Sequence, residues 1–158
     1  MKRRLISGPG QPERSAYDRG LSMLARREYS RRELRARLER AGCDEAESEA
    51  ALGKLREQHY QDDARFGDMI TRTRMGQGYG PARIRAELRS HGLADPEIRE
   101  LIDAADADWD ALAAAQLRKK YGDRPALDRV ERGKRAAFLL RRGFSAATVR
   151  IVCHSDVD

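Results

Sequence analysis

The chain has 158 residues, of which 37% are charged and 6% are aromatic, so it holds few bulky side chains for one thick globular core. Lysine and arginine total 32 against 26 acidic residues, which gives a net charge of +6. This basic excess fits a polyanionic partner such as DNA or a nucleoprotein, although a helical protein with paired surface charges shares the composition. Two distant cysteines, Cys43 and Cys153, exclude a disulfide framework.

Residues 1–14 predict a flexible N-terminal arm. Four largely basic residues are followed by residues 7–12, in which glycine and proline break any helix. Because no apolar segment follows the basic residues, a signal peptide is not expected, and the cytoplasm is the expected location. The chain has no run of 18 or more apolar residues, so no transmembrane helix is expected.

Residues 15–57 predict three short amphipathic helices. A first apolar stripe precedes Ser30, which forms a capping box with Glu33 at the start of the second helix. Gly42 ends that helix in a left-handed conformation, and Asp44 caps the third. The inner positions expected in this first unit are Tyr17, Leu21, Leu24, Leu34, Leu38, Ala41, Leu52 and Leu55.

Residues 58–105 repeat this plan at an offset of 50 positions, since the segment from Tyr29 to Gly42 aligns with the segment from Tyr79 to Gly92. Glycines at 76 and 78 break the chain, and Pro81 suits the first position of the middle helix. The first helix of this unit is marked by Phe66, Met69, Ile70 and Thr73, and the inner positions expected in the other two helices are Ile84, Leu88, Ile98, Leu101 and Ile102.

Residues 106–158 hold a weaker third copy, in which Leu139 falls 51 positions after Leu88. A helix containing Trp109 is broken at residues 122–125, and residues 128–142 and 145–153 predict the other two helices. An apolar residue follows the glycine of each copy, so Cys43 is expected to be a core residue. The predicted fold is all-α, with about nine helices as three tandem three-helix repeats in an elongated, curved array.

Residues that could carry catalysis are scattered. His59, His91 and His154 lie in three different repeats, and neither an HExxH motif nor a Cys/His cluster occurs. The glycine-rich residues 76–80 lack the GK[ST] sequence of a phosphate-binding loop and follow no strand. We therefore expect no catalytic residue, no metal site, no cofactor and no enzymatic activity.

Basic clusters recur in all three repeats and are the strongest functional signal. They lie near the end of each first helix and along each second helix, so stacked repeats would align them along one surface suited to a phosphate backbone or an acidic groove. The candidate residues of this basic face are Arg26, Arg27, Arg31, Arg32, Arg35, Arg72, Arg74, Arg83, Arg85, Arg118, Lys119, Lys120, Lys134, Arg135, Arg141 and Arg142.

Two segments carry a resemblance to a known family. Residues 58–66, QHYQDDARF, have an aromatic residue, a short polar step, Asp-Asp and then Arg-Phe, and residues 80–92 follow the pattern G-x-x-R-I-x-x-E-L-x-x-x-G. Together with the apolar patterns of the outer repeats, these segments resemble the bacterial RecX family over roughly residues 16–152. Gln61 and the N-terminal arm depart from the family pattern.

The resemblance implies three tandem three-helix repeats and a non-enzymatic regulator of the RecA recombinase. Family members bind the RecA–DNA filament in its helical groove and usually inhibit its ATP hydrolysis, strand exchange and coprotease activity in recombination, DNA repair and the SOS response. The expected partners are thus the RecA filament and, weakly and non-specifically, single- and double-stranded DNA, with the chain a monomer. The alternative is a helix-turn-helix DNA-binding regulator that acts without RecA, or a scaffold for acidic proteins.

Overall fold

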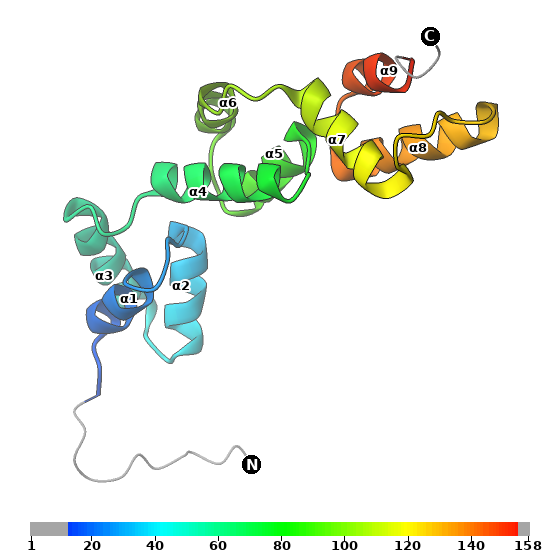
Figure 1. The fold of residues 1–158 in the computed structure, drawn as a ribbon. Helices are drawn as coiled ribbons and strands as arrows, with labels where there is room; N and C mark the ends of the chain where they lie inside the picture. The colour runs from blue at the N-terminus through cyan, green and yellow to red at the C-terminus, as the bar shows by residue number, and fades with distance from the viewer. Residues whose placement is uncertain (1–12, 155–158) are drawn as a thin grey trace, which may run out of the picture. The chain divides into compact units, whose positions relative to one another are not determined.

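The computed structural model describes residues 13–154, which form nine α-helices and no strand (Figure 1). These residues divide into two compact units between Gln61 and Asp62. Of the expected N-terminal arm, only residues 13 and 14 are among those described. The helices are α1 (Ala16–Leu24), α2 (Arg31–Arg40), α3 (Glu45–Glu57), α4 (Asp63–Gly76), α5 (Pro81–Ser90), α6 (Asp95–Ala104), α7 (Trp109–Tyr121), α8 (Arg129–Arg142) and α9 (Ala146–His154).

The first unit contains repeat 1, formed by α1, α2 and α3. Side-chain caps set the helix starts: Ser30 Oγ accepts a hydrogen bond from the Glu33 backbone nitrogen at 3.1 Å, and Asp44 caps α3 in the same way. Gly42, with φ of 97°, ends α2 as predicted. The core cluster includes the fully buried Leu34, Leu38, Leu52 and Leu55. Together these contacts give the repeat a small core of its own.

Two core predictions for repeat 1 have different outcomes. Cys43 is half-buried and packs against the core cluster, which confirms its expected place. Ala41 is exposed, so its expected burial is wrong. It is the C-cap of α2, one residue beyond the end of the helix, and it neither belongs to the core cluster nor packs against it.

The second unit begins with repeat 2, formed by α4, α5 and α6. Asp62 caps α4, and prolines stand in the first turn of α5 and of α6, where no intrahelical donor is lost. The buried cluster contains Phe66, Ile84, Leu88 and Ile98. The core is again local to three helices. Thr73 is exposed, and its hydroxyl donates to Met69 Sδ on the same helix at 3.8 Å.

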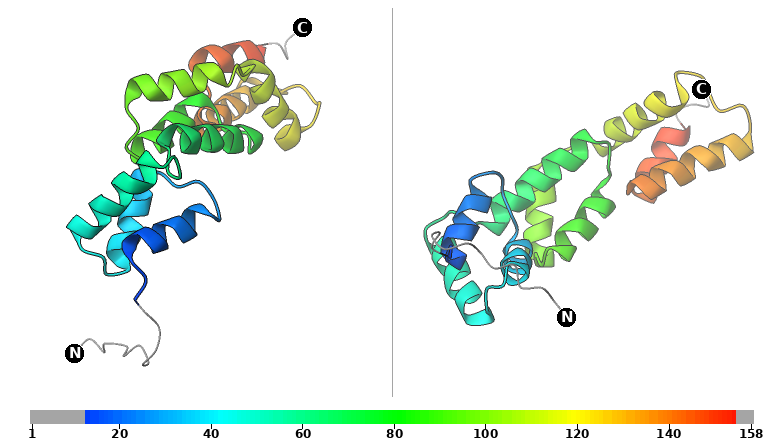
Figure 2. Two further views of the ribbon diagram at one scale, coloured as in Figure 1. Left: turned by 90° about the vertical axis from the view of Figure 1, so that its left-hand side faces the viewer. Right: turned by 90° about the horizontal axis from the view of Figure 1, so that it is seen from below.

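Repeat 3 is formed by α7, α8 and α9, with α9 packed beside α8 (Figure 2). Leu117, Leu139 and Phe144 belong to its buried cluster. Its middle helix departs from the other two. Arg135 stands 51 positions after Ile84, in the place of a core aliphatic residue, and only 3% of it is exposed.

Repeats 2 and 3 are joined through the ends of two helices. The backbone nitrogens of Gly80 and Ala82, at the start of α5, donate to the carbonyls of Arg142 (2.8 Å) and Gly143 (3.0 Å) at the end of α8. A Cβ on Gly80 would lie 2.4 Å from the Gly143 carbonyl carbon, so this approach requires glycine. Trp109 packs against the core clusters of both repeats. The second unit is therefore held by backbone pairing and a shared aromatic residue.

The fold class expected from the sequence is confirmed: the described residues are all-helical and form three successive three-helix repeats. α2 and α5 start 50 positions apart, as the internal repeat predicts, whereas α8 starts at Arg129, three residues before the position that corresponds to Pro81. In each repeat, the glycine that ends the middle helix and the apolar residue after that glycine lie where the internal repeat placed them. No helix among the described residues combines the length and apolar character needed to cross a membrane.

Candidate basic interface

In repeat 1, most of the candidate arginines are held by carboxylates. Arg27 pairs with Glu33 at 2.5 Å and stacks on the Tyr29 ring at 3.6 Å. Its hydrogen bond to Glu33 raises the pKa of the Arg27 guanidinium. Arg31 and Arg35 both pair with Glu49 on α3. These three arginines therefore link α2 to its surroundings within the unit, and their charge is largely compensated.

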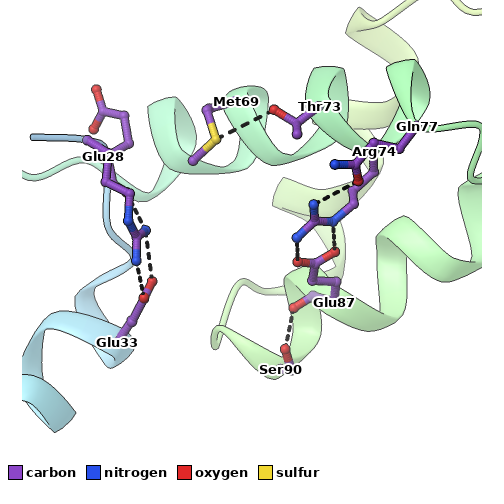
Figure 3. Close-up of polar contacts among 9 residues, drawn as sticks. Glu28, Glu33, Met69, Thr73, Arg74, Gln77, Glu87 and Ser90 are labelled. Carbon is purple, nitrogen blue, oxygen red and sulfur yellow. Dashed lines mark hydrogen bonds and ion pairs between the residues drawn. The ribbon is translucent and has the colours of Figure 1, made fainter.

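In repeat 2, Arg74 is fixed between two helices. Its guanidinium donates to both Glu87 oxygens, at 2.7 and 2.6 Å, and to Gln77 Oε1 at 2.9 Å (Figure 3). The hydrogen bonds of this fork are the main cause of two pKa shifts: they lower the pKa of Glu87 and raise the pKa of Arg74. Arg72 pairs with Asp68 one turn away at 3.0 Å. Arg83, by contrast, is exposed and stacks on the Tyr79 ring.

In repeat 3, the candidate residues differ in their surroundings. Arg118 pairs with Asp123 at 3.2 Å. Arg135 is buried, where it donates to Glu131 and to the Arg124 carbonyl, so it serves the interior rather than the surface. Arg142 donates to the carbonyls of Gln77 (2.5 Å) and Gly78 (3.2 Å) and stacks on Tyr79, which makes it part of the junction with repeat 2.

Four of the seven candidate cations of repeat 3 make neither an ion pair nor a hydrogen bond within residues 13–154: Lys119, Lys120, Lys134 and Arg141. Lys134, Phe138 and Arg141 occupy positions i, i+4 and i+7 of α8, and this spacing places their side chains on one face of the helix. Lys120 Nζ lies 4.2 Å from the centre of the Phe138 ring. The structure thus gathers Lys120, Lys134 and Arg141 around one half-buried aromatic residue.

Charge is unevenly divided among the repeats. Residues 16–61 hold ten Lys or Arg and nine Asp or Glu, residues 62–105 hold seven and eight, and residues 106–154 hold eleven and six. The net charges are thus +1, −1 and +5. The recurrence of arginine clusters concealed this difference, and a count of carboxylates in each repeat would have revealed it. Phe138 was also missed, because an isolated phenylalanine on a helix is usually a core residue.

The residues needed for metal or nucleophilic chemistry do not converge in the described part of the chain. Among residues 13–154, no three His, Cys, Asp or Glu side chains form a group that could hold a metal ion. Burial raises the pKa of the Cys43 thiol, so the nucleophilic thiolate is disfavoured. His91 caps the C-terminus of α5 and its ring lies 4.6 Å from that of Phe66.

Comparison with protein families accounts for each repeat in turn. Residues 16–55, 62–102 and 106–153 match the first, second and third three-helix domains of RecX. The chain belongs to the RecX family. RecX-family relatives named "Regulatory protein RecX" include one from Stenotrophomonas maltophilia, 38% identical over 92% of this chain and 90% of the relative. Another, from Acidithiobacillus ferrooxidans, is 47% identical over 84% of each chain.

Solved RecX structures share the fold. A crystal structure of regulatory protein RecX superposes with a TM-score of 0.74 at 26% identity, covering 87% of this chain and 69% of that one. RecX from Lactobacillus salivarius superposes with a TM-score of 0.75 at 20% identity, covering 90% and 94%. The succession of three three-helix repeats is therefore a property that this RecX-family chain shares with distant members.

Proposed function

We propose that this chain binds the RecA–DNA nucleoprotein filament and inhibits its ATPase, strand-exchange and coprotease activities. The observation that carries the proposal is the match of all three repeats, in order, to the three RecX domains. Relatives that carry the name "Regulatory protein RecX" over most of their length support a regulatory role. The chain acts by binding, in the cytoplasm, as a monomer and without a cofactor or catalytic activity of its own.

The proposed mechanism is bridging. A chain of three helical repeats, with boundaries at residues 15–57, 58–105 and 106–158, lies in the filament groove and spans neighbouring RecA subunits. Because the contacts hold adjacent subunits together, the rearrangements needed for ATP turnover are hindered, or a growing filament end is capped. The exposed basic residues supply the attraction to an anionic nucleoprotein.

The test is the single-stranded-DNA-dependent ATPase rate of RecA as the protein is titrated in. We expect inhibition at well below one molecule per RecA, because one bridging or capping molecule affects many subunits. An unchanged ATPase rate at every ratio, together with specific protection of a duplex operator in the absence of RecA, would replace this proposal with the helix-turn-helix regulator.

A further inference from the structure

The three repeats provide an internal comparison at one surface position of the middle helix. The positions at i, i+4 and i+7 are occupied by Glu33, Arg37 and Arg40 in repeat 1. At the internal offsets of 50 and 51 residues, the corresponding positions are Arg83, Glu87 and Ser90 in repeat 2, and Lys134, Phe138 and Arg141 in repeat 3. The first two repeats each place a carboxylate on this face, and the third places none.

Those carboxylates neutralise the arginines around them. Glu33 pairs with Arg27 at 2.5 Å and lies 3.8 Å from Arg37. Glu87 takes both hydrogen bonds of the Arg74 fork. Arginines held in this way have their donors occupied by protein, so an incoming phosphate would have to displace a carboxylate first. The clusters of repeats 1 and 2 therefore stabilise the fold more than they attract an anion.

In repeat 3, an aromatic contact takes the place of the ion pair. Phe138 meets Tyr121, from the last turn of α7, edge-on with ring centres 6.1 Å apart. Lys120 Nζ lies over the Phe138 ring at 4.2 Å, which orients the ammonium without neutralising its charge. Lys134 and Arg141 flank Phe138 on the exposed side of α8. This face thus carries three uncompensated cations, and it lies in the repeat with the largest positive net charge among the described residues.

We propose that Lys120, Lys134 and Arg141, gathered around Phe138, form a patch that binds the phosphate backbone of DNA. The arginine clusters of repeats 1 and 2 contribute little to this contact. Lysine is depleted at protein–protein interfaces but serves well as a point charge for phosphate, so two lysines in the patch favour nucleic acid over an acidic protein surface. The inference rests on the proposed function in one respect, because it takes the bound DNA to be the DNA of a RecA–DNA filament.

The test compares two full-length variants that lose the same charge. One carries Lys120→Gln, Lys134→Gln and Arg141→Gln; the control carries Arg40→Gln, Arg56→Gln and Arg99→Gln, which are exposed residues of repeats 1 and 2 without an ion pair among those described. Binding of fluorescein-labelled oligothymidylate is followed by fluorescence anisotropy at increasing NaCl. Circular dichroism checks that both variants are folded.

We expect the patch variant to bind more weakly and to flatten the slope of log K against log salt by about 2, since each phosphate contact on a single strand contributes about 0.7. The control should keep a slope close to that of the unchanged protein. Equal losses in the two variants would overturn the proposal, because charge anywhere on the chain would then suffice. A double variant, Lys134→Gln with Arg141→Gln, leaves Lys120 on Phe138 and keeps the test valid if the triple variant unfolds.

Two further outcomes separate this inference from the proposed function. The oligothymidylate assay contains no RecA, so a protein that fails to inhibit the RecA ATPase can still show the expected slope, and only the proposed function is then lost. If the patch variant binds oligothymidylate normally but no longer binds immobilised RecA without DNA, the patch recognises an acidic protein surface and the inference is wrong.

Discussion

At the scale of single residues, carboxylates determine what the arginines of this chain can do. Glu33, Glu49 and Glu87 each hold one or two guanidinium groups, which leaves most of the candidate arginines of repeats 1 and 2 engaged within the protein. The partners come from different helices in the case of Glu49 and Glu87, so the ion pairs also connect elements. Substituting such an arginine tests stability as much as binding.

Glu87→Gln should lower the free energy of unfolding by about 1 kcal/mol at pH 7, a value kept small because the pair is partly exposed to solvent. Hydrogen bonds from Arg74 lower the pKa of Glu87 in the folded chain. Its stabilising contribution is therefore complete above the pKa of a free glutamate, about 4.3, and is lost as the pH falls through the lower folded value.

Urea unfolding of the unchanged protein and of the variant at pH 7 and near pH 3 measures this effect. The difference between the two should shrink at the lower pH. Glu100→Gln is the matched control, because Glu100 is exposed on α6 and has no ion pair among the described residues. A Glu87→Gln difference that stays constant with pH would exclude the ion pair as its cause.

At the scale of elements, the ends of α5 and α8 make the second unit one body. Carbonyls at the end of α8 accept hydrogen bonds from amides at the start of α5, so each helix end satisfies backbone groups that the other leaves open. Gly143 has φ of 98°, and a Cβ on it would lie 2.6 Å from Arg83 Cβ. Both the conformation and the space at this point require glycine.

Gly143→Ala should therefore cost about 3 kcal/mol or more in the free energy of unfolding, from left-handed backbone strain combined with a steric clash. Gly42→Ala is the control, because Gly42 has a similar φ of 97° but nothing within 4 Å of an added Cβ. It should cost about 1 kcal/mol from strain alone. Thermal and urea unfolding of the two variants, followed by circular dichroism, measures the difference. If the two variants lose the same free energy of unfolding, the junction between α5 and α8 accommodates the added methyl group without strain, and the prediction is wrong.

The helices themselves were predictable from the sequence, but the side-chain contacts between them were predictable only in part. Local signals such as the Ser30 cap and the glycines at 42, 92 and 143 act within a few residues, and all lie where they were expected. The burial of Arg135 could not be predicted, because it depends on partners such as the Arg124 carbonyl in a preceding loop. Among the candidate basic residues, pairing likewise depends on which carboxylates the fold brings near, and their role in binding stays a prediction.

At the scale of the whole molecule, the two units differ in charge. The described residues of the first unit, 13–61, hold eleven Lys or Arg and ten Asp or Glu, and those of the second, 62–154, hold eighteen and fourteen. The second unit is thus at +4 and the first at +1. Since each unit has its own buried core, binding and folding can be tested on each separately.

Fragments covering residues 13–61 and 62–154 should each be helical by circular dichroism. The 62–154 fragment should bind oligothymidylate with a salt dependence close to that of the full protein, while the 13–61 fragment should bind it weakly at most. Anisotropy titrations of both fragments under one set of salt conditions provide the measurement. Stronger binding by the 13–61 fragment would contradict the charge argument.

The glycine contact between repeats 2 and 3 also limits how such a chain can grow by duplication. A fourth copy docked onto repeat 3 as repeat 3 docks onto repeat 2 would bring its own glycine against the position that corresponds to Gly80, which is Glu131. Glu131 has a Cβ, its carboxylate already accepts from the Leu127 nitrogen, and α8 runs through this point as continuous helix. If repeat 3 alone were duplicated in tandem, the added repeat could not dock onto repeat 3 through this contact. Docking of a further repeat would need a compensating change at residue 131.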